Sequence, residues 1–350
     1  MSNQGFHVAV MGATGAVGQQ ILAKLAERNF PIKKLTLLSS ARSAGTEIEF
    51  KGDTITVQEA TPDLFEGVDI ALFSAGGSIS EKFAQEAVKR GAIVIDNTSH
   101  FRMHPDVPLI VPEVNAHAAK EHKGIIANPN CSTIQMVGAL QPIREKFGLN
   151  KVVVSTYQAV SGAGAAAINE MKEQSKAILN NEEFTPEILP VGSAEKHYQI
   201  AFNVVPQIDT FAENGYTLEE MKMINETKKI MENNELHVAA TCVRLPVETG
   251  HSESVYIEVD QENVSVEDLQ AVLADAPGIT LQDDPTNQVY PMPAQAHGKD
   301  DIFVGRIRKD LDSATGFHLW IVSDNLLKGA ALNTIQIAES LIEQGVVTAK

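Results

Sequence analysis

The chain has 350 residues, of which 43% are hydrophobic and 21% charged, so it can bury a large core and is long enough for two domains. Its formal net charge is −17 at pH 7, which repels nucleic acid and anionic membranes and excludes both as expected partners. No apolar run reaches the roughly 18 residues that span a bilayer, and the first residues lack a signal-peptide pattern, so we expect a cytoplasmic protein.

The cysteines exclude two further classes. Only Cys131 and Cys242 occur, far apart in the chain and without a CxxC or HExxH motif. This argues against a disulfide-stabilised scaffold and against a structural zinc site, and we expect no bound metal.

Short apolar segments alternate with amphipathic ones in the first hundred residues. Strands are expected over residues 6–12, 33–40, 68–75 and 92–99, with helices over 15–29 and 80–91. Buried strands joined by helices predict a parallel sheet with helices on both faces, hence an α/β, Rossmann-type dinucleotide-binding domain. Residues 47–60 contain a Gly-Asp turn between two alternating runs and predict an inserted hairpin.

Three glycines follow the first expected strand. Gly12, Gly15 and Gly18 form a GxxGxxG spacing, a variant of the dinucleotide fingerprint, and a helix follows at once. Glycines let the turn tighten and let backbone N–H groups approach a pyrophosphate at the helix N-terminus. A glycine-rich turn that serves only helix–strand packing is the alternative, but the position in the first βαβ unit favours the cofactor site.

The end of the second expected strand discriminates between the two nicotinamide cofactors. An NAD enzyme usually carries Asp or Glu here, which binds the ribose 2′-hydroxyl. This chain has instead Ser39, Ser40, Arg42 and Ser43. Hydroxyls and a guanidinium suit a 2′-phosphate, so the sequence favours NADP, the alternative for Arg42 being an ordinary solvated loop arginine.

The pattern changes at Lys151. Longer and partly alternating strands are expected over residues 151–164, 202–209, 237–247, 254–260, 301–310 and 316–324, with a helix over 217–234. The last apolar run, 325–344, predicts a helix whose Gly329, Ala330 and Ala331 permit close packing. We therefore expect an NADP-binding domain over residues 1–130, joined by a C-terminal helix within 325–350. Residues 131–324 are expected to form an α+β catalytic and dimerisation domain.

Cys131 lies where an apolar-periodic helix is expected to begin, in NPNCSTIQM. A thiol with a pKa of about 8.5 is only about 3% thiolate at pH 7, and lowering that pKa by about two units costs about 2.7 kcal/mol. A helix N-terminus together with a nearby imidazolium can supply an effect of that order. The alternative is a buried structural cysteine, which is how we interpret Cys242 in its apolar strand.

Two other segments carry candidate partners for the thiol. Arg244 and His251 flank a turn with Pro and Gly after an expected strand, where side chains can point into a cleft. Glu219 and Lys222 lie three residues apart on an expected helix, hence on one face. For this second pair the alternative is a simple surface salt bridge.

Taken together, these segments resemble the aspartate-semialdehyde dehydrogenase family along nearly the whole chain, in the shorter form found in Gram-positive bacteria. The resemblance is carried by GATGAVG, LLSSARSAG, the block DNTS…FRM…DVPLIVPEVN, NPNCSTIQM, YQAVSGAG, EEMKM…ETKKI, RLPVETGHS and SDNLLKGAA. It implies a reversible, NADPH-dependent reductive dephosphorylation of β-aspartyl phosphate to aspartate β-semialdehyde. It further implies a role in lysine, threonine, methionine and diaminopimelate biosynthesis, and a homodimer or homotetramer.

The resemblance also implies site residues. Cys131 would form an acyl thioester, His251 would be the general acid–base and Gln158 would orient the thioester. Arg244 would bind the substrate carboxylate, Glu219 rather than Glu220 its ammonium, and Arg102 with Lys222 the phosphate. The implied cofactor contacts are Gly12, Thr14, Gly15, Ala16, Val17, Arg42, Ser43, Ser161, Gly162 and Asn325.

Other functions remain as alternatives. N-acetyl-γ-glutamyl-phosphate reductase shares the Rossmann start and a catalytic thiol, but in a different neighbourhood from Asn-Cys-Ser. Glyceraldehyde-3-phosphate dehydrogenase has Ser-Cys-Thr-Thr and prefers NAD. A short-chain dehydrogenase needs Tyr-x-x-x-Lys, which is absent from the sequence. From another class, a non-catalytic NADP-binding protein is the remote alternative.

Overall fold

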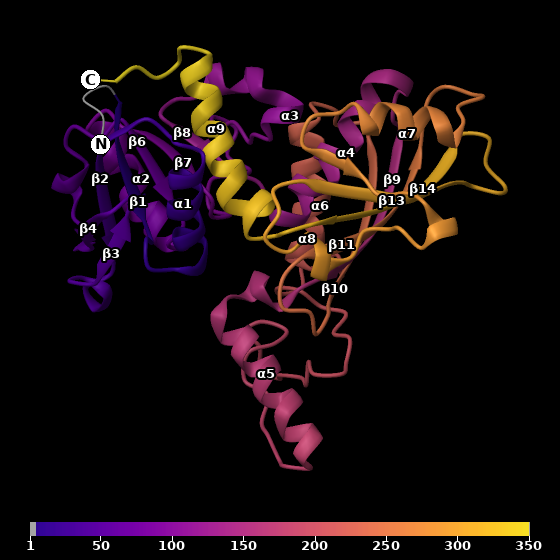
Figure 1. The fold of residues 1–350 in the computed structure, drawn as a ribbon, viewed down its shortest axis with the longest axis horizontal. Coiled ribbons are helices and arrows are strands. Elements are labelled where there is room, and N and C mark those ends of the chain that lie inside the picture. Colours follow the sequence, from indigo (N-terminus) through magenta and orange to yellow (C-terminus); the bar gives the residue numbers. More distant parts are fainter. Residues whose placement is uncertain (1–4, 350) are drawn as a thin grey trace. The chain divides into compact units, whose positions relative to one another are not determined.

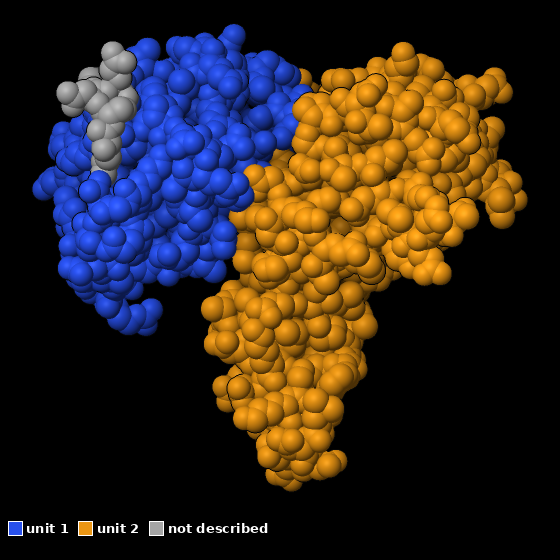
Figure 2. All heavy atoms as spheres, viewed as in Figure 1, with its two compact units in different colours: residues 1–130, 330–350 blue, residues 131–329 orange. Residues whose placement is uncertain are grey.

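The computed structural model describes residues 5–349, which fall into two compact units (Figures 1 and 2). Unit 1 comprises the described residues of 1–130 and 330–350, and unit 2 comprises 131–329. No helix in the part of the chain that the structure describes is both long and apolar enough to cross a membrane.

Unit 1 is built on a six-stranded sheet in which every pair of neighbours is parallel, in the order β5-β2-β1-β6-β7-β8. Its strands are β1 (Phe6–Met11), β2 (Ile32–Ser39), β5 (Gln58–Glu59), β6 (Ile70–Phe73), β7 (Ile93–Asp96) and β8 (Ile125–Ala127). Its helices are α1 (Ala16–Glu27), α2 (Gly77–Lys89), the short α3 (Pro112–Asn115) and α9 (Leu332–Glu343). The parallel sheet is confirmed, and α9 packs on α1.

Two details of unit 1 follow directly from the sequence. The expected hairpin is present as β3 (Glu47–Phe50) and β4 (Asp53–Thr56). In the glycine-rich turn, Gly12 has φ +88°, a value that L side chains rarely adopt. A Cβ added at Gly18 would lie 2.1 Å from the Gly12 carbonyl oxygen, so only glycine lets helix α1 begin this close to β1.

Unit 2 contains a mixed six-stranded sheet in the order β10-β9-β11-β14-β13-β12. The strands are β9 (Lys151–Gln158), β10 (His237–Arg244), β11 (His251–Glu258), β12 (Ile279–Leu281), β13 (Ile302–Lys309) and β14 (Gly316–Ser323). Helices α4 (Cys131–Phe147), α6 (Leu218–Ile230) and α7 (Val266–Ala274) contact this sheet, and α5 (Ala165–Asn180) and α8 (Pro293–Ala296) complete the unit. The strand order is largely non-sequential, as expected for an α+β unit.

Along strand β9, only one face of the unit 2 sheet is covered. In β9, Val152, Val154 and Thr156 are buried, whereas Val153 is 38% exposed and Tyr157 is half-buried. Because side chains alternate between the faces of a strand, the buried set faces helices α4, α6 and α7. The other side of the sheet carries Val153 and Tyr157 and is here called the open face.

Two expectations for residues beyond 200 are wrong in detail. Residues 202–209 do not form a strand: Val205 makes only an isolated bridge to Arg244. Phe202 has φ +55°, and Pro206 has no N–H to donate, so pairing stops on both sides of Val205. The C-terminal helix begins at Leu332 rather than at residue 325, after a π-helical turn over Leu327–Ala331.

Candidate active site

Cys131 is the first residue of helix α4 and its side chain is half-buried. The first turn of α4 contains no acidic residue, so the positive end of the helix dipole acts on the thiol unopposed from within the helix. A Cβ added at Gly329 would lie 2.8 Å from the Cys131 Cβ, so a side chain at residue 329 would push the thiol away. The expected close packing at Gly329 is therefore present, and it occurs against the cysteine itself.

Three of the predicted site residues lie at one edge of the unit 2 sheet. Gln158 ends β9 and pairs directly with Arg244, which ends the parallel strand β10. His251 begins β11, which runs antiparallel to β9, and this places it at the same edge. All three are buried, and none is more than 4% exposed.

The main chain fixes the orientation of the His251 ring. The Ala159 N–H donates to His251 Nδ1 at 3.1 Å, so in the neutral ring the proton is on Nε2. Burial and the neighbouring Arg244 guanidinium lower the pKa of His251 to about 3. The imidazolium that we expected to assist the thiol is therefore not favoured at neutral pH, and the ring is a neutral imidazole with a proton to donate.

Arg244 is the cation that acts on the thiol. Its Nη1 donates to the Ala159 carbonyl oxygen at 2.7 Å, and its Nε has no hydrogen-bond partner among residues 5–349. Burial lowers the pKa of Arg244, while the negative charges of Glu219 and Cys131 oppose that shift. Coulomb interaction is mutual, so a thiolate at residue 131 is stabilised by this buried guanidinium. The remaining N–H donors suit a carboxylate of a ligand.

Glu219 and Lys222 share one face of helix α6, as their spacing predicts, and Glu219 lies next to Gln158. Gln158 Nε2 donates to Glu219 Oε1 at 3.1 Å, and Lys222 Nζ donates to Glu219 Oε2 at 3.2 Å and to Asp209 at 2.9 Å. Glu219 is 5% exposed, and its negative charge opposes the lowering of the Arg244 pKa, so the two groups belong to one buried cluster.

The Glu220 carboxylate binds main-chain N–H groups. One of its oxygens accepts from the Thr217 N–H in a capping box, and the other accepts from the Cys242 N–H. Both oxygens thus hold the main chain, which leaves Glu219 as the glutamate available to a ligand. Cys242 is fully buried and burial raises the pKa of its thiol, so the interpretation of this residue as part of the core is confirmed.

The predicted cofactor contacts of unit 2 adjoin this cluster. A Cβ added at Gly162 would lie 3.0 Å from Arg244 Nη1 and 3.4 Å from His251 Nε2, so glycine leaves space beside both groups. Asn325 donates to Ser161 Oγ at 3.0 Å and accepts from the Gly250 N–H at 2.9 Å. This amide therefore holds the turn that precedes His251.

The predicted cofactor contacts of unit 1 have features that suit dinucleotide phosphates. Helix α1 begins after Gly15 without a side-chain cap and without an acidic residue in its first turn, and Gly15 and Ala16 are exposed. The Thr14 and Ser39 hydroxyls lie 3.0 Å apart between the first and second strands. Arg42 is exposed in a short 3₁₀ turn after β2 and forms no ion pair with any residue of 5–349. The residues present fit the pyrophosphate and an additional 2′-phosphate.

Arg102 is the one predicted substrate-binding residue in unit 1. Its Nε donates to the Asn128 carbonyl oxygen at 2.9 Å, and its Nη2 donates to the Asn97 carbonyl oxygen at 3.0 Å. Arg102 is 8% exposed. Two main-chain acceptors thus hold its orientation.

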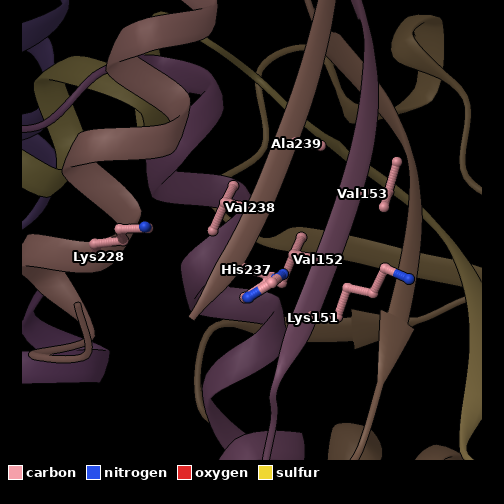
Figure 3. A pocket seen from close by; sticks show the side chains of 7 residues that line it. All are labelled: Lys151, Val152, Val153, Lys228, His237, Val238 and Ala239. Carbon is pink, nitrogen blue, oxygen red and sulfur yellow. The ribbon is translucent and has the colours of Figure 1, made fainter. Parts of the chain in front are cut away.

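A basic pocket in unit 2 is separate from the cysteine cluster (Figure 3). It has a volume of about 310 Å³ and is lined by Lys151, Val152, Val153, Lys228, His237, Val238 and Ala239. Lys151 and His237 are the first residues of β9 and β10, whose last residues are Gln158 and Arg244. The pocket therefore lies at the opposite end of these strands.

Two buried polar residues beside His251 were not predicted from the sequence. Gln135, on α4, donates from Nε2 to the His251 carbonyl oxygen at 3.3 Å, and Glu253 lies two residues after His251 on β11. Both side chains are fully buried. The available signal was a single polar residue between Ile134 and Met136 in an apolar helical run, which is too weak to identify a site.

Comparison with known proteins gives matches over both units. Residues 7–122 match the family described as "Semialdehyde dehydrogenase, NAD binding domain". Residues 140–328 match the family described as "Semialdehyde dehydrogenase, dimerisation domain".

Three relatives illustrate the match. "Aspartate-semialdehyde dehydrogenase" of Bacillus subtilis is 70% identical over 338 residues, covering 97% of this chain and 98% of the relative. The crystal structure of aspartate semialdehyde dehydrogenase II from Vibrio cholerae, complexed with ASA, has a TM-score of 0.91 at 46% identity and covers 97% of this chain and 99% of that one. The Candida albicans enzyme with NADP has a TM-score of 0.74 at 26% identity and covers 98% and 99%. The chain belongs to the aspartate-semialdehyde dehydrogenase family.

Proposed function

We propose that this oxidoreductase converts β-aspartyl phosphate and NADPH reversibly to aspartate β-semialdehyde, phosphate and NADP through an acyl thioester on Cys131. The observation that carries the proposal is the cluster in unit 2. A thiol at a helix N-terminus interacts with a buried guanidinium, and a neutral imidazole with a proton on Nε2 lies beside that guanidinium. The reaction belongs to lysine, threonine, methionine and diaminopimelate biosynthesis.

The first step uses Cys131. Its thiolate attacks the acyl carbon of β-aspartyl phosphate, the bond from that carbon to the phosphate oxygen breaks, and phosphate leaves with the electron pair. The helix N-terminus and the Arg244 charge keep the sulfur ionised for this attack. Arg102 and Lys222 are proposed to bind the departing phosphate.

His251 acts as the general acid–base in the second step. Bound NADPH supplies the hydride that reduces the thioester. As the hydride arrives, the Nε2–H of His251 donates a hydrogen bond to the thioester oxygen, which gains negative charge, and shares its proton with that oxygen in the tetrahedral thiohemiacetal on Cys131. The proton returns fully to Nε2 as the carbon–oxygen double bond re-forms, the carbon–sulfur bond breaks and the aldehyde leaves, with the Cys131 thiolate restored. The low pKa of His251 keeps the ring neutral, so that the Nε2–H is present as a donor at neutral pH.

Three residues are proposed to hold the substrate. The Arg244 guanidinium binds the α-carboxylate and Glu219 the α-ammonium, because each charged group is buried at the same sheet edge. Gln158 orients the thioester carbonyl, and its own amide is fixed by Thr156, whose hydroxyl donates to Gln158 Oε1 at 2.9 Å. The complex of the Vibrio cholerae relative with ASA supports this substrate.

Three aldehydes tested in parallel distinguish the candidate functions. NADP reduction should be fast with aspartate semialdehyde and slow with N-acetylglutamate semialdehyde or glyceraldehyde 3-phosphate. It should stall when phosphate and arsenate are both omitted, because the thioester needs that acceptor. A substantial rate without either anion would indicate a non-phosphorylating aldehyde dehydrogenase, and a preference for N-acetylglutamate semialdehyde would favour the runner-up reductase.

Arg42 is proposed to select NADP over NAD by pairing with the 2′-phosphate, with Ser43 beside it. A charge-assisted hydrogen bond contributes about 1.5–3 kcal/mol, so Arg42→Ala should raise the KM for NADP by roughly 10- to 100-fold. The KM for NAD should stay unchanged. Lys51→Ala is the matched control, since Lys51 is an exposed cation of unit 1 that donates to Asn29. An equal rise in the KM values for NADP and NAD would rule out this role for Arg42.

We propose that a second copy covers the open face of the unit 2 sheet to form a homodimer. The open face carries Val153, Ser155, Tyr157, Thr241, Ser254, Tyr256, His318 and Trp320. The Tyr157 and Trp320 rings lie 5.5 Å apart there, and a partly apolar face of this kind is expected to be buried in an assembly. The matching dimerisation family supports this.

Light scattering of a charged variant tests the dimer. Ser155→Glu introduces a carboxylate at the centre of the open face. The molar mass measured in solution should therefore shift toward that of a monomer. Leu311→Glu is the control, because Leu311 is 99% exposed in the turn after β13. A Ser155→Glu protein with unchanged mass would show that this face is not the interface.

A further inference from the structure

Helix α4 carries a buried glutamine one turn after the nucleophile. Gln135 follows Cys131 by four residues, so both side chains lie on the same side of the helix. Gln135 is 0% exposed. A buried amide destabilises the fold unless its donors and acceptor are satisfied, so its partners reveal what it does.

The amide links the helix to two strands. Gln135 Nε2 donates to the His251 carbonyl oxygen at 3.3 Å, and Gln135 Oε1 accepts from Ser323 Oγ at 2.8 Å. His251 and Ser323 are directly opposite each other on β11 and β14. One side chain therefore ties the helix that begins at the thiol to the main chain that carries the imidazole.

Glu253 adds a second buried polar group on the same side of β11. It is two residues after His251 and 0% exposed, and neither carboxyl oxygen has a hydrogen bond of normal geometry in the described chain. Burial raises the pKa of Glu253 well above its ordinary value, and the Gln135 amide offsets this only in part. Burial therefore favours the uncharged acid form of Glu253.

We propose that Gln135 is a positioning residue for the reaction: with Ser323 and the buried Glu253, it fixes the distance between the Cys131 thiol and the His251 imidazole. This inference rests on the proposed function. His251 is the first residue of its strand and follows Gly250, which has φ +97°. Within the sheet, only β14 pairs with His251. The Gln135 bond supplies the constraint from the helix side.

The test replaces Gln135 with methionine, which keeps an unbranched side chain of similar length and loses both hydrogen bonds. Small misplacements of reacting groups can cost about 10²-fold, so kcat should fall by roughly 10- to 100-fold. The KM values for aspartate semialdehyde and NADP should stay within about two-fold, since neither ligand is proposed to touch Gln135. The pH profile of Cys131 alkylation by iodoacetamide should move to higher pH, because the thiolate loses its fixed position near Arg244.

Gln141→Met is the matched control. It makes the same change on the same helix, but Gln141 donates to Glu145 and not to the sheet, so kcat and alkylation should equal those of the original protein. Ser323→Ala is a smaller change and should shift both readouts in the same direction as Gln135→Met. Glu253→Gln keeps an uncharged group of the same shape and should leave the pH profile unchanged.

Several outcomes would overturn the inference. Wild-type kcat and alkylation in both Gln135→Met and Ser323→Ala would exclude positioning by this amide. A kcat loss that only tracks a lowered melting temperature, with unchanged alkylation, would mean a purely structural role. A shifted profile for Glu253→Gln would show that Glu253 is charged. Failure of the unaltered protein to oxidise aspartate semialdehyde would instead refute the proposed function, and alkylation would still test the positioning.

Discussion

Replacing Cys131 with alanine should abolish turnover while NADP binding stays within about a few-fold of that of the unaltered protein. The sulfur forms the thioester, and no other group in the cluster can replace that bond. Loss of a covalent nucleophile should lower kcat by roughly 10⁴-fold or more. The measurements are the rate of NADP reduction with aspartate semialdehyde and phosphate, and a fluorescence titration with NADPH.

The second cysteine provides the control for this result. Cys242→Ala removes a thiol that is buried in β10 and whose pKa is raised by burial, so activity should be retained. A Cys131→Ala protein that still reduces NADP at a substantial rate would falsify the thioester route. A loss of activity in both variants would point to damage of the fold around β10 rather than to chemistry.

Changing Arg244 to lysine should lower kcat/KM for aspartate semialdehyde by roughly 10²- to 10³-fold, because truncating one member of a buried charged pair costs about 2–5 kcal/mol. Lysine keeps a positive charge but loses the planar fork that binds Ala159 and can still reach a carboxylate. The preference for aspartate semialdehyde over an aldehyde that lacks the carboxylate should collapse. Steady-state kinetics with both aldehydes gives this ratio.

Arg144→Lys is the matched control for that experiment. Arg144 lies on helix α4, half-buried, and its Nη1 donates to Gln141 Oε1 at 3.5 Å. Its replacement should leave both rates unchanged. If Arg244→Lys slowed both aldehydes equally, Arg244 would act on the thiolate alone and the assignment to the substrate carboxylate would be wrong.

The local parts of the fold were predictable because short-range physics determines them. The apolar runs around β1 and β6, the glycine spacing before α1 and the position of Cys131 at a helix start all follow from periodicity and backbone preference. The same reasoning failed at residues 202–209, where the apolar pattern resembles a strand. There, the backbone of Phe202 and the missing N–H of Pro206 prevent pairing.

The remaining parts depend on contacts between distant segments. The sheet order brings Gln158, Arg244 and His251 to one edge, and no local pattern specifies that order. Glu253 stands in an alternating strand where a carboxylate is normally exposed, yet it lies on the face of β11 that helix α4 covers. The expectation that a His251 imidazolium assists the thiol was wrong. Burial and Arg244 determine the charge of this ring, and neither can be read from the sequence.

The ring of His251 is oriented by a peptide group rather than by an acidic side chain. A peptide N–H does not gain or lose a proton anywhere in the range where proteins stay folded, so acidification cannot release the imidazole from Ala159 until the ring itself is protonated. The orientation of the His251 Nε2–H is therefore independent of whether neighbouring side chains are ionised.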